Sequence, residues 1–377
     1  MRLIPFVAAA VAAVAVLTGG AALAAGVQKS PRSAPQFDGT VYATAYLGDT
    51  VYVGGSFGNA IVAGRSYPRA RLAAFDARTG ALLPWAPGAD DTVRGLAADG
   101  DSVYAIGDFS RISGAKRDSL AKLGASTGAV DAFSHAIAGS PVAIGVGGGR
   151  VYVAGRFTAV DSARRSNLAA FSTATGALDT RWAPTADDTV EALAVAKDRV
   201  YLGGRFHKVN GVANALRLTA VDPATGALDK GFLPRPGAVV LAVAVAADGT
   251  VVAGMGGQGG RAAAYSPAGR EKWTRVFDGD VQAVGALDGV AYVGGHFDKA
   301  CKTPRNGSQG VCTDGSLPRV KLAAVDGAGR LLDWAPQANG IVGVRTITTS
   351  EPLRQVVAGG EFTMIAGAGW KRLAVFG

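Results

Sequence analysis

The amino-acid sequence predicts an all-β fold, a seven-bladed β-propeller of four-stranded blades. Three observations lead to this prediction. One short phrase recurs seven times at intervals of roughly 50 residues. A second phrase follows several of its copies, and short runs of β-branched and aromatic residues lie between turn residues along the chain. No helical period competes with these runs.

The first phrase has the pattern of a buried strand that ends in two glycines, one variable residue and a phenylalanine. It is VYVGGSF at residues 51–57, and its other copies lie at 103–109, 151–157, 200–206, 251–256, 291–297 and 357–362. Other runs, such as 239–246, are almost continuously apolar. Such runs predict strands buried on both faces, as in sheets that stack radially against their neighbours.

The second phrase predicts a strand, a tight turn and a further strand. It is LAAFDARTGAL at residues 72–82, with close copies at 168–178 and 218–228. Asp or Ser opens the turn with a side-chain acceptor, and Gly closes it with a residue that tolerates positive φ. An aromatic residue and a proline follow, and then the next apolar strand begins. Each unit therefore holds four short strands.

The two ends of the chain predict how the ring closes. The last unit stops at residues 373–377, on its third strand, while FDGTV at 37–41 matches FDGDV at 277–281 and belongs to an extra half-unit. We expect the N-terminal segment to supply the last strand of the C-terminal blade, which removes exposed sheet edges. Residues 26–377 then form a single propeller domain. A right-handed parallel β-helix is the alternative, although its repeats are shorter.

The recurring phrases resemble those of the delta-60 repeat β-propeller family, exported bacterial propellers of unknown function, over about residues 41–376. AFDARTGALLPW at 74–85 has a weaker similarity to the docking motif of quinoprotein-like propellers, from which it departs by one extra residue before the Trp. The motif is structural in both families. The resemblance therefore implies the fold and a bacterial source, and it implies no cofactor.

The N-terminus predicts export. Residues 1–25 form an almost unbroken apolar run after Met1 and Arg2 and end in the small-x-small pattern of a signal peptide. A retained membrane anchor is the alternative, because the run is long enough to span a bilayer. No later apolar run is that long. We expect a monomer that is secreted, extracellular or cell-wall associated and is free of the membrane after cleavage.

Cys301 and Cys312, the only two cysteines, lie in one segment rich in Gly, Ser, Asn and Lys. In an oxidising compartment they are expected to form a disulfide that staples a local loop. Metal ligation is the competing interpretation, and it would need His296 and a fourth ligand. No metal and no cofactor are expected.

The formal net charge of +9 suits an anionic partner. Lys and Arg are scattered through the loops and are not clustered with aromatic residues, so we expect no nucleic acid. The expected partner is an extracellular glycan, an anionic wall polymer or a protein.

The variable residue of the first phrase marks a candidate binding site on the loop-rich face. It changes type from blade to blade while its neighbours stay constant: Ser56, Asp108, Arg156, Arg205, Met255, His296 and Glu361. His207 adds a second imidazole one residue after Phe206. The alternative is that these are ordinary strand ends, solvated or paired with neighbours. The carboxylate pairs at 90–91 and 187–188 occupy corresponding positions, which favours turn and capping roles over acid–base catalysis.

These observations predict a non-enzymatic binding module, with Arg156, Arg205 and His296 as contacts to an anionic ligand and the insert at 299–317 as a specificity loop. The alternative is an extracellular enzyme, either a glycan lyase or hydrolase or a quinoprotein-like oxidoreductase. It would use His207 or His296 with Asp108 or Glu361 as acid and base, and it requires such groups within hydrogen-bonding reach. A structural or assembly role is a third possibility. No catalytic residue is assigned.

Overall fold

The computed structural model describes residues 26–377 of the chain. The predicted signal peptide at 1–25 lies outside the described residues. Within residues 26–377 the regular structure is strand, apart from the short 3₁₀ turn η1 (Ser308–Gly310). No helix in this part of the chain is long and apolar enough to cross a membrane.

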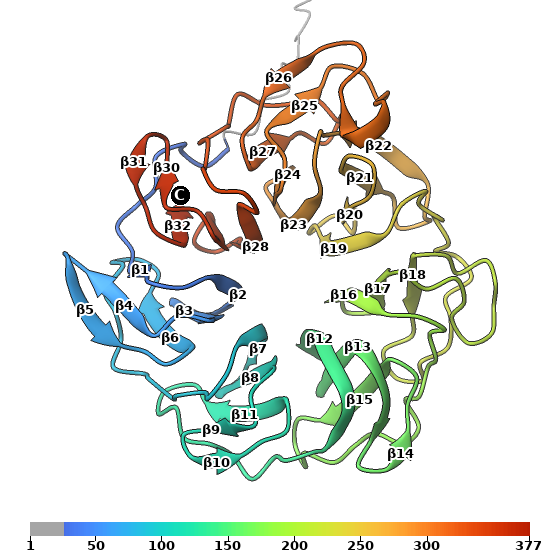
Figure 1. Ribbon diagram of the computed structural model, residues 1–377. Helices are drawn as coiled ribbons and strands as arrows, with labels where there is room; N and C mark the ends of the chain where they lie inside the picture. The colour runs from blue at the N-terminus through green and yellow to red at the C-terminus, as the bar shows by residue number, and fades with distance from the viewer. Residues whose placement is uncertain (1–25) are drawn as a thin grey trace, which may run out of the picture.

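Seven antiparallel sheets share one plan and are numbered here in chain order (Figure 1). The inner strands, nearest the centre, are β2 (Val41–Leu47), β7 (Val93–Asp99), β12 (Ile137–Gly147), β16 (Val190–Val195), β19 (Val240–Val245), β23 (Val281–Leu287) and β28 (Val344–Ser350). The second strands are β3 (Thr50–Gly55), β8 (Ser102–Gly107), β13 (Arg150–Val160), β17 (Val200–Gly204), β20 (Val251–Met255), β24 (Val290–Gly295) and β29 (Gln355–Gly360). The third strands are β6 (Leu72–Asp76), β11 (Leu120–Gly124), β15 (Leu168–Ser172), β18 (Leu218–Val221), β21 (Arg261–Tyr265), β27 (Leu322–Val325) and β32 (Leu373–Phe376).

The predicted fourth strand is a regular strand only in sheet 5, where β22 (Glu271–Val276) pairs with β21. In other sheets it shrinks to a single bridge, as between Phe75 and Leu82. A proline follows soon after that bridge in sheet 1, at Pro84 and Pro87, whereas β22 contains none. Because proline lacks the N–H that a ladder needs, the sheet cannot extend there.

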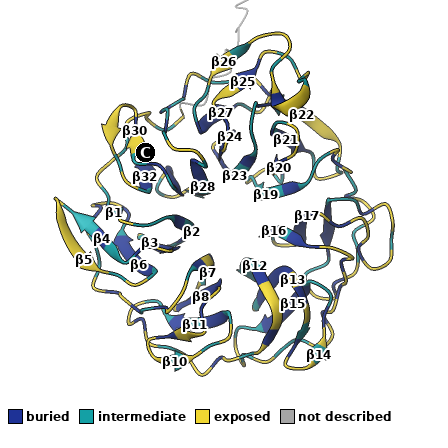
Figure 2. Ribbon diagram, in the orientation of Figure 1, coloured by how far each residue is buried: buried dark blue, intermediate teal, exposed yellow. Residues whose placement is uncertain are grey.

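Hairpins and short bridging strands extend the outer part of several sheets. They are β1 (Gln36–Phe37), β4 (Asn59–Val62), β5 (Arg65–Pro68), β9 (Arg111–Ile112), β10 (Ala115–Lys116), β14 (Ala163–Arg164), β25 (Lys299–Cys301), β26 (Ser316–Pro318), β30 (Met364–Ile365) and β31 (Ala368–Gly369). The second and third strands of the sheets are almost entirely buried, while β5 is exposed and β26 is largely exposed (Figure 2).

The hydrophobic core lies between neighbouring sheets. One cluster joins Tyr52 and Trp85 of sheet 1 to Val93 and Phe109 of sheet 2, and the same kind of cluster recurs from sheet to sheet. Each second strand is therefore covered on both faces, which explains its continuous apolar run, whereas inner strands such as β19 stay partly exposed.

The first and last sheets are also neighbours. One core cluster contains Val41 of sheet 1 and Val375 of sheet 7, and the hydroxyls of Thr44 and Thr348 lie 2.7 Å apart. Arg32 N donates to Val375 O at 2.7 Å, which places the N-terminal segment beside the edge of β32 through one bridge.

The two matched FDG segments make equivalent contacts in their own sheets. Phe37 lies 4.4 Å from Phe57 between ring centroids, and Phe277 lies 4.4 Å from Phe297.

Candidate functional site

Every inner strand carries a β-bulge, at the second residue in six of the strands and at the sixth residue in the longer β12. The cross-strand register jumps there, and one residue has no partner on the second strand. The seven bulge residues are Tyr42, Arg94, Val142, Glu191, Leu241, Gln282 and Arg345. A bulge re-aims a side chain that regular pairing would direct into the neighbouring sheet.

The bulge residues line one shared hollow at the centre of the molecule. All seven border a space of about 380 Å³, together with Asp280. This hollow is called the mouth below. Its lining is uneven, because Arg345, Tyr42 and Arg94 follow one another around the ring while Val142 and Leu241 lie on either side of Glu191. One side is cationic and aromatic, and the other side combines the apolar Val142 and Leu241 with the polar Glu191, Asp280 and Gln282.

Tyr42 lies between two guanidinium groups. The Cζ of Arg94 lies 5.6 Å from the Tyr42 ring centroid, and the Cζ of Arg345 lies 5.9 Å from it. Both distances are within the range of a cation–π interaction. The ring is therefore held between two charged groups that come from the neighbouring sheets.

Each arginine is oriented by an acidic residue of its own sheet. Arg94 Nε lies 2.8 Å from both carboxylate oxygens of Asp108, and Arg345 Nη2 lies 3.1 Å from Glu361 Oε1. The hydrogen bond to Asp108 is the main reason why the pKa of Arg94 is raised. These pairs are partly exposed to solvent, so they orient the side chains more than they stabilise the fold.

The predicted variable positions are thus partners of the bulge residues. Asp108 and Glu361 bind the bulge arginines, and Arg205 Nε binds Glu191 Oε1 at 2.6 Å with the charges reversed. In these three sheets the variable residue is paired with a neighbouring charged residue, which is the alternative interpretation given in the sequence analysis. The pairs also belong to the mouth, because one partner of each lines it.

The remaining predicted site residues stay apart. Ser56, Arg156, His207 and His296 are exposed and belong to four different sheets; Arg156 lies within β13, and the other three follow a second strand. Between residues 26 and 377 no hydrogen bond or ion pair joins His296 to Asp108 or Glu361. The acid–base constellation that the enzyme hypothesis requires is not assembled by such contacts.

The assignment of Met255 to the variable position was wrong. Val240 pairs with Met255, just as Val41 pairs with Gly55, so Met255 replaces the second glycine of the phrase. The variable residue of sheet 5 is therefore Gly256, which has no side chain. The hairpin between β19 and β20 is one residue longer than that of sheet 1, which shifts the register.

The recurring aspartates have a structural role. Asp90 Oδ1 accepts the backbone N–H groups of Ser110 and Arg111, and Asp187 Oδ1 accepts those of His207 and Lys208. These carboxylates tie the loop that enters a sheet to the loop that follows its second strand. This agrees with the turn and capping interpretation.

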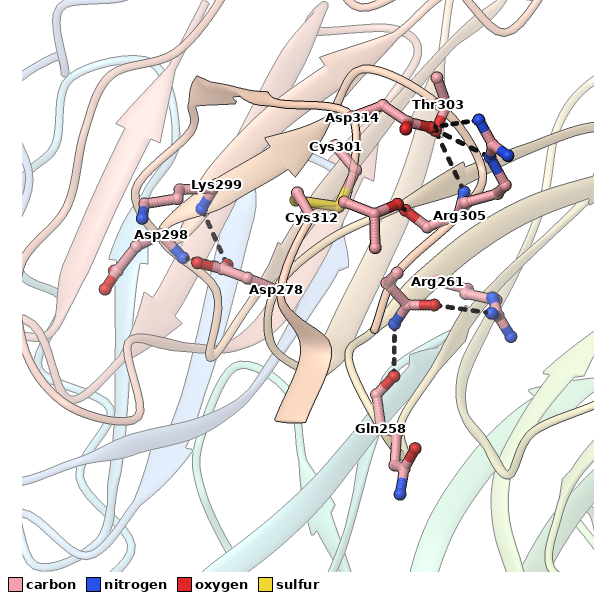
Figure 3. Close-up of a disulfide and its surroundings, with 12 residues drawn as sticks. Gln258, Arg261, Asp278, Asp298, Lys299, Cys301, Thr303, Arg305, Cys312 and Asp314 are labelled. Atoms are coloured by element: carbon pink, nitrogen blue, oxygen red, sulfur yellow. Dashed lines mark hydrogen bonds and ion pairs between the residues drawn. A yellow bond between two sulfur atoms is a disulfide. The ribbon is translucent and has the colours of Figure 1, made fainter. Parts of the chain in front are cut away.

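The disulfide between Cys301 and Cys312 is present, and it closes a separation of 11 residues (Figure 3). The insert packs over the short loop that joins β20 to β21 in sheet 5. Asn306 Nδ2 donates to Gln258 O at 2.5 Å, and Arg261 Nη2 donates to Asn306 Oδ1 at 3.2 Å. In sheet 1 the β4–β5 hairpin stands at the place of this short β20–β21 loop. Nowhere in residues 26–377 do three or more His, Cys, Asp or Glu side chains group in a way that could hold a metal ion.

The seven bulge residues are not among the site residues that the sequence predicts. The signal was available, because the bulge residue follows a Val or Pro at the start of each inner strand and changes type while its neighbours stay small or apolar. The same reasoning had been applied only to the phrase that ends in Phe. Nothing in the linear pattern shows that a bulge turns these residues toward a common centre.

Comparison with known proteins shows the fold. No family model and no curated protein matches the chain. The chain is similar to the WD40 β-propeller domain of Doa1, with a TM-score of 0.60, 10% identity and coverage of 92% of this chain and 96% of that one. It is also similar to the computationally designed Ika8 protein, with a TM-score of 0.49, 17% identity and coverage of 91% and 98%. The similarity to the Doa1 domain shows that the chain has a β-propeller fold, and it indicates no activity.

Proposed function

We propose that the protein is an exported, seven-bladed β-propeller of the delta-60 repeat type that binds a glycan carrying carboxylate groups at its mouth and has no catalytic activity. In this proposal residues 26–377 form one ring, and each of the seven sheets is a blade. The bridge of Arg32 to Val375 and the core shared by the first and last sheets support closure by the N-terminal segment.

One observation carries the proposed function: Tyr42 lies between Arg94 and Arg345 at the edge of the mouth. A guanidinium recognises a carboxylate through paired N–H donors, and the hydroxyl of Tyr42 can form hydrogen bonds with the hydroxyl groups of a sugar. Each of these arginines uses only part of its five donors in its ion pair, so donors remain for a ligand.

The ion pairs also prepare the site. Asp108 and Glu361 hold the two guanidinium groups on either side of the ring before any ligand arrives. A site that is ordered in advance loses less conformational entropy on binding. The absence of contacts between His296 and these acidic groups within the described residues favours a binding role over acid–base catalysis.

The test is isothermal titration calorimetry with a galacturonate hexamer and with a neutral maltohexaose. We expect the acidic oligosaccharide to bind, and we expect Tyr42→Ala and Arg345→Ala each to weaken binding about tenfold or more, since charge-assisted contacts contribute about 1.5–3 kcal/mol. Arg78→Ala is the matched control, because Arg78 also pairs with a carboxylate, Asp49, but lies at the other end of sheet 1.

Two results would overturn the proposal. One is equal affinity for the neutral and the acidic oligosaccharide. The other is binding of the acidic oligosaccharide that neither mouth variant weakens. Export is tested separately, by measuring whether the mass of the protein recovered from the culture medium lacks the residues up to about position 25.

A further inference from the structure

A tyrosine of the second strand meets another aromatic ring edge-on in five of the sheets. The pairs are Tyr52–Trp85, Tyr104–Phe133, Tyr152–Trp182, Tyr201–Phe232 and Tyr292–Trp334, with ring centroids 5.0–6.0 Å apart. Edge-to-face pairs of this kind are favourable beyond the area that they bury. The pair is therefore a repeated element of the packing between sheets.

The tyrosine hydroxyl also links neighbouring sheets. Tyr52 Oη donates to Ala125 O at 2.8 Å, and Tyr152 Oη donates to Pro223 O at 2.8 Å. Both acceptors lie at the same position in the turn after the third strand of the next sheet. At these junctions the tyrosine ring packs against an aromatic ring, and its hydroxyl donates a hydrogen bond to a backbone carbonyl of the next sheet.

Sheet 5 lacks this tyrosine. Val252 occupies its place, because it pairs with Ala244 and Ala264 as Tyr52 pairs with Ala45 and Ala74. Trp273 lies beside it, and no aromatic partner of Trp273 is found in residues 26–377.

A cavity of about 70 Å³ lies at this junction between sheets 5 and 6. Most of its lining is apolar: Ala246, Val252, Ala264, Trp273, Ala286, Val290 and Ala291. Gly327 also borders it and occupies the position of Ala125 and Pro223, relative to its own third strand. No hydrogen bond to Gly327 O occurs among the described residues. The cavity exceeds the roughly 10–15 Å³ that one water needs, and its apolar lining offers water few partners.

The other junction with a valine at this position is filled. Val357 of sheet 7 has the same register, but Gln355 is buried beside it and its Nε2 donates to Ala77 O at 2.9 Å. Ala77 is the equivalent of Gly327 in sheet 1. Replacing Tyr by Val does not by itself leave a cavity, because at sheet 7 the Gln355 side chain occupies the space.

The rim of the cavity is polar and reaches solvent. Lys272 Nζ donates to Thr250 Oγ1 at 2.9 Å and lies 3.9 Å from Asp248 Oδ2. The Lys272 and Asp248 side chains are 37% and 67% exposed, so the entrance is bordered by surface groups and not by the core. This entrance lies at the end of β19 opposite the bulge residue Leu241, away from the mouth.

We propose that this cavity binds a phenolic ring, which takes the place of the missing tyrosine side chain. The ring contacts Trp273 edge-on and fills the space above Val252, and the hydroxyl donates to Gly327 O. The ligand class is a small phenol or the tyrosine side chain of a peptide, since both present the same chemistry. The site is independent of the glycan site proposed above.

The experiment uses p-cresol, which is the tyrosine side chain as a free molecule, and toluene, which lacks only the hydroxyl. Binding to the full protein is measured by thermal shift and by ligand-detected saturation-transfer NMR. We expect p-cresol to bind about five- to tenfold more tightly than toluene, because one neutral hydrogen bond contributes about 1 kcal/mol. A tripeptide with a central tyrosine, compared with its alanine counterpart, then separates the two sources of the phenol.

Val252→Tyr supplies the ring from the chain itself. It is expected to raise the Tm and to abolish p-cresol binding, while Tyr42→Ala at the mouth leaves p-cresol binding unchanged. Val252→Phe is a second variant that fills the cavity without the hydroxyl, and it also should not bind p-cresol. The proposal is wrong if p-cresol does not bind, if toluene binds equally well, or if either filled variant that folds still binds p-cresol.

Discussion

Replacing Asp90 tests whether the recurring carboxylates stabilise the loops between sheets. Asp90 Oδ1 accepts the N–H groups of Ser110 and Arg111, each at 2.9 Å, and its Oδ2 accepts the Ser110 hydroxyl at 2.7 Å. The same position is occupied in other sheets by Asp38, Asp187, Asp278 and Asn339, each of which accepts two backbone N–H groups.

Asp90→Ala removes all three hydrogen bonds. A single hydrogen bond contributes about 0.5–1.5 kcal/mol net, and removal of an aspartate that caps backbone N–H groups typically costs about 1 kcal/mol. Because Asp90 is exposed, water can replace part of the lost contacts. We expect the free energy of unfolding to fall by about 1–3 kcal/mol.

Asp90→Asn is the matched control that the chain itself provides. Asn339 Oδ1 accepts the N–H groups of Thr363 and Met364 at 2.8 and 2.9 Å, and its Nδ2 donates to Thr363 Oγ1 at 2.9 Å. An asparagine at position 90 can make the same set of bonds with Ser110 and Arg111. Its effect on stability at pH 7 should stay within about 0.5 kcal/mol.

Lowering the pH separates charge from geometry. Partial burial raises the pKa of Asp90, but the hydrogen bonds from Ser110 and Arg111 outweigh it and hold the pKa below its usual value. A carboxyl whose pKa is depressed on folding stabilises the protein above its unfolded pKa of about 3.9 and loses that contribution as the pH falls through the folded value. Wild type should therefore lose stability relative to Asp90→Asn on acidification.

The assay is urea unfolding followed by circular dichroism at pH 7 and pH 2.5, with hydrogen exchange of the Ser110 and Arg111 amides as the local readout. The alanine variant should exchange faster at both amides, and the asparagine variant should not. The reasoning is refuted if the alanine variant is as stable as wild type, or if the asparagine variant loses as much stability as the alanine variant.

Three further predictions concern the ends, the insert and the turns. Replacing Cys301 and Cys312 together by Ser should cost at most about 3 kcal/mol and should increase proteolysis within the insert, because the disulfide closes a short loop; unchanged proteolysis would contradict this. Arg32→Pro removes the N–H that bridges to the last strand and should lower the Tm, whereas Arg32→Ala keeps that N–H and should lower it less, as scanning calorimetry can measure. Hydrogen bonds from Thr79 hold the pKa of Asp76 below its usual value, so the urea midpoint of wild type should fall between about pH 4 and pH 2 more steeply than that of Asp76→Asn; parallel curves would exclude this role.

Much of the fold could be predicted because its signals are local and repeated. The strands, the turns and the pairing of Cys301 with Cys312 follow from short patterns that recur or from the redox logic of a cysteine pair. The length of the fourth strand was overestimated, because the sheet stops at a bridge such as Phe75 with Leu82 and the chain then turns away at proline. The sequence predicts the candidate site at the ends of the second strands, whereas the bulge residues that line the mouth lie on the inner strands. The alignment of Met255 with the variable position is wrong by one residue.

The all-β class, the repeat and the positions that vary between repeats follow from the sequence, because each of these depends on residues close together in the chain. The roles of the variable positions depend on how the sheets are arranged in space. A bulge in each inner strand turns Tyr42 and Arg345 toward a common hollow, although about 300 residues separate them in the sequence. The empty place beside Trp273 is likewise visible only when two sheets are packed together, because a cavity belongs to the space between elements and not to any one of them.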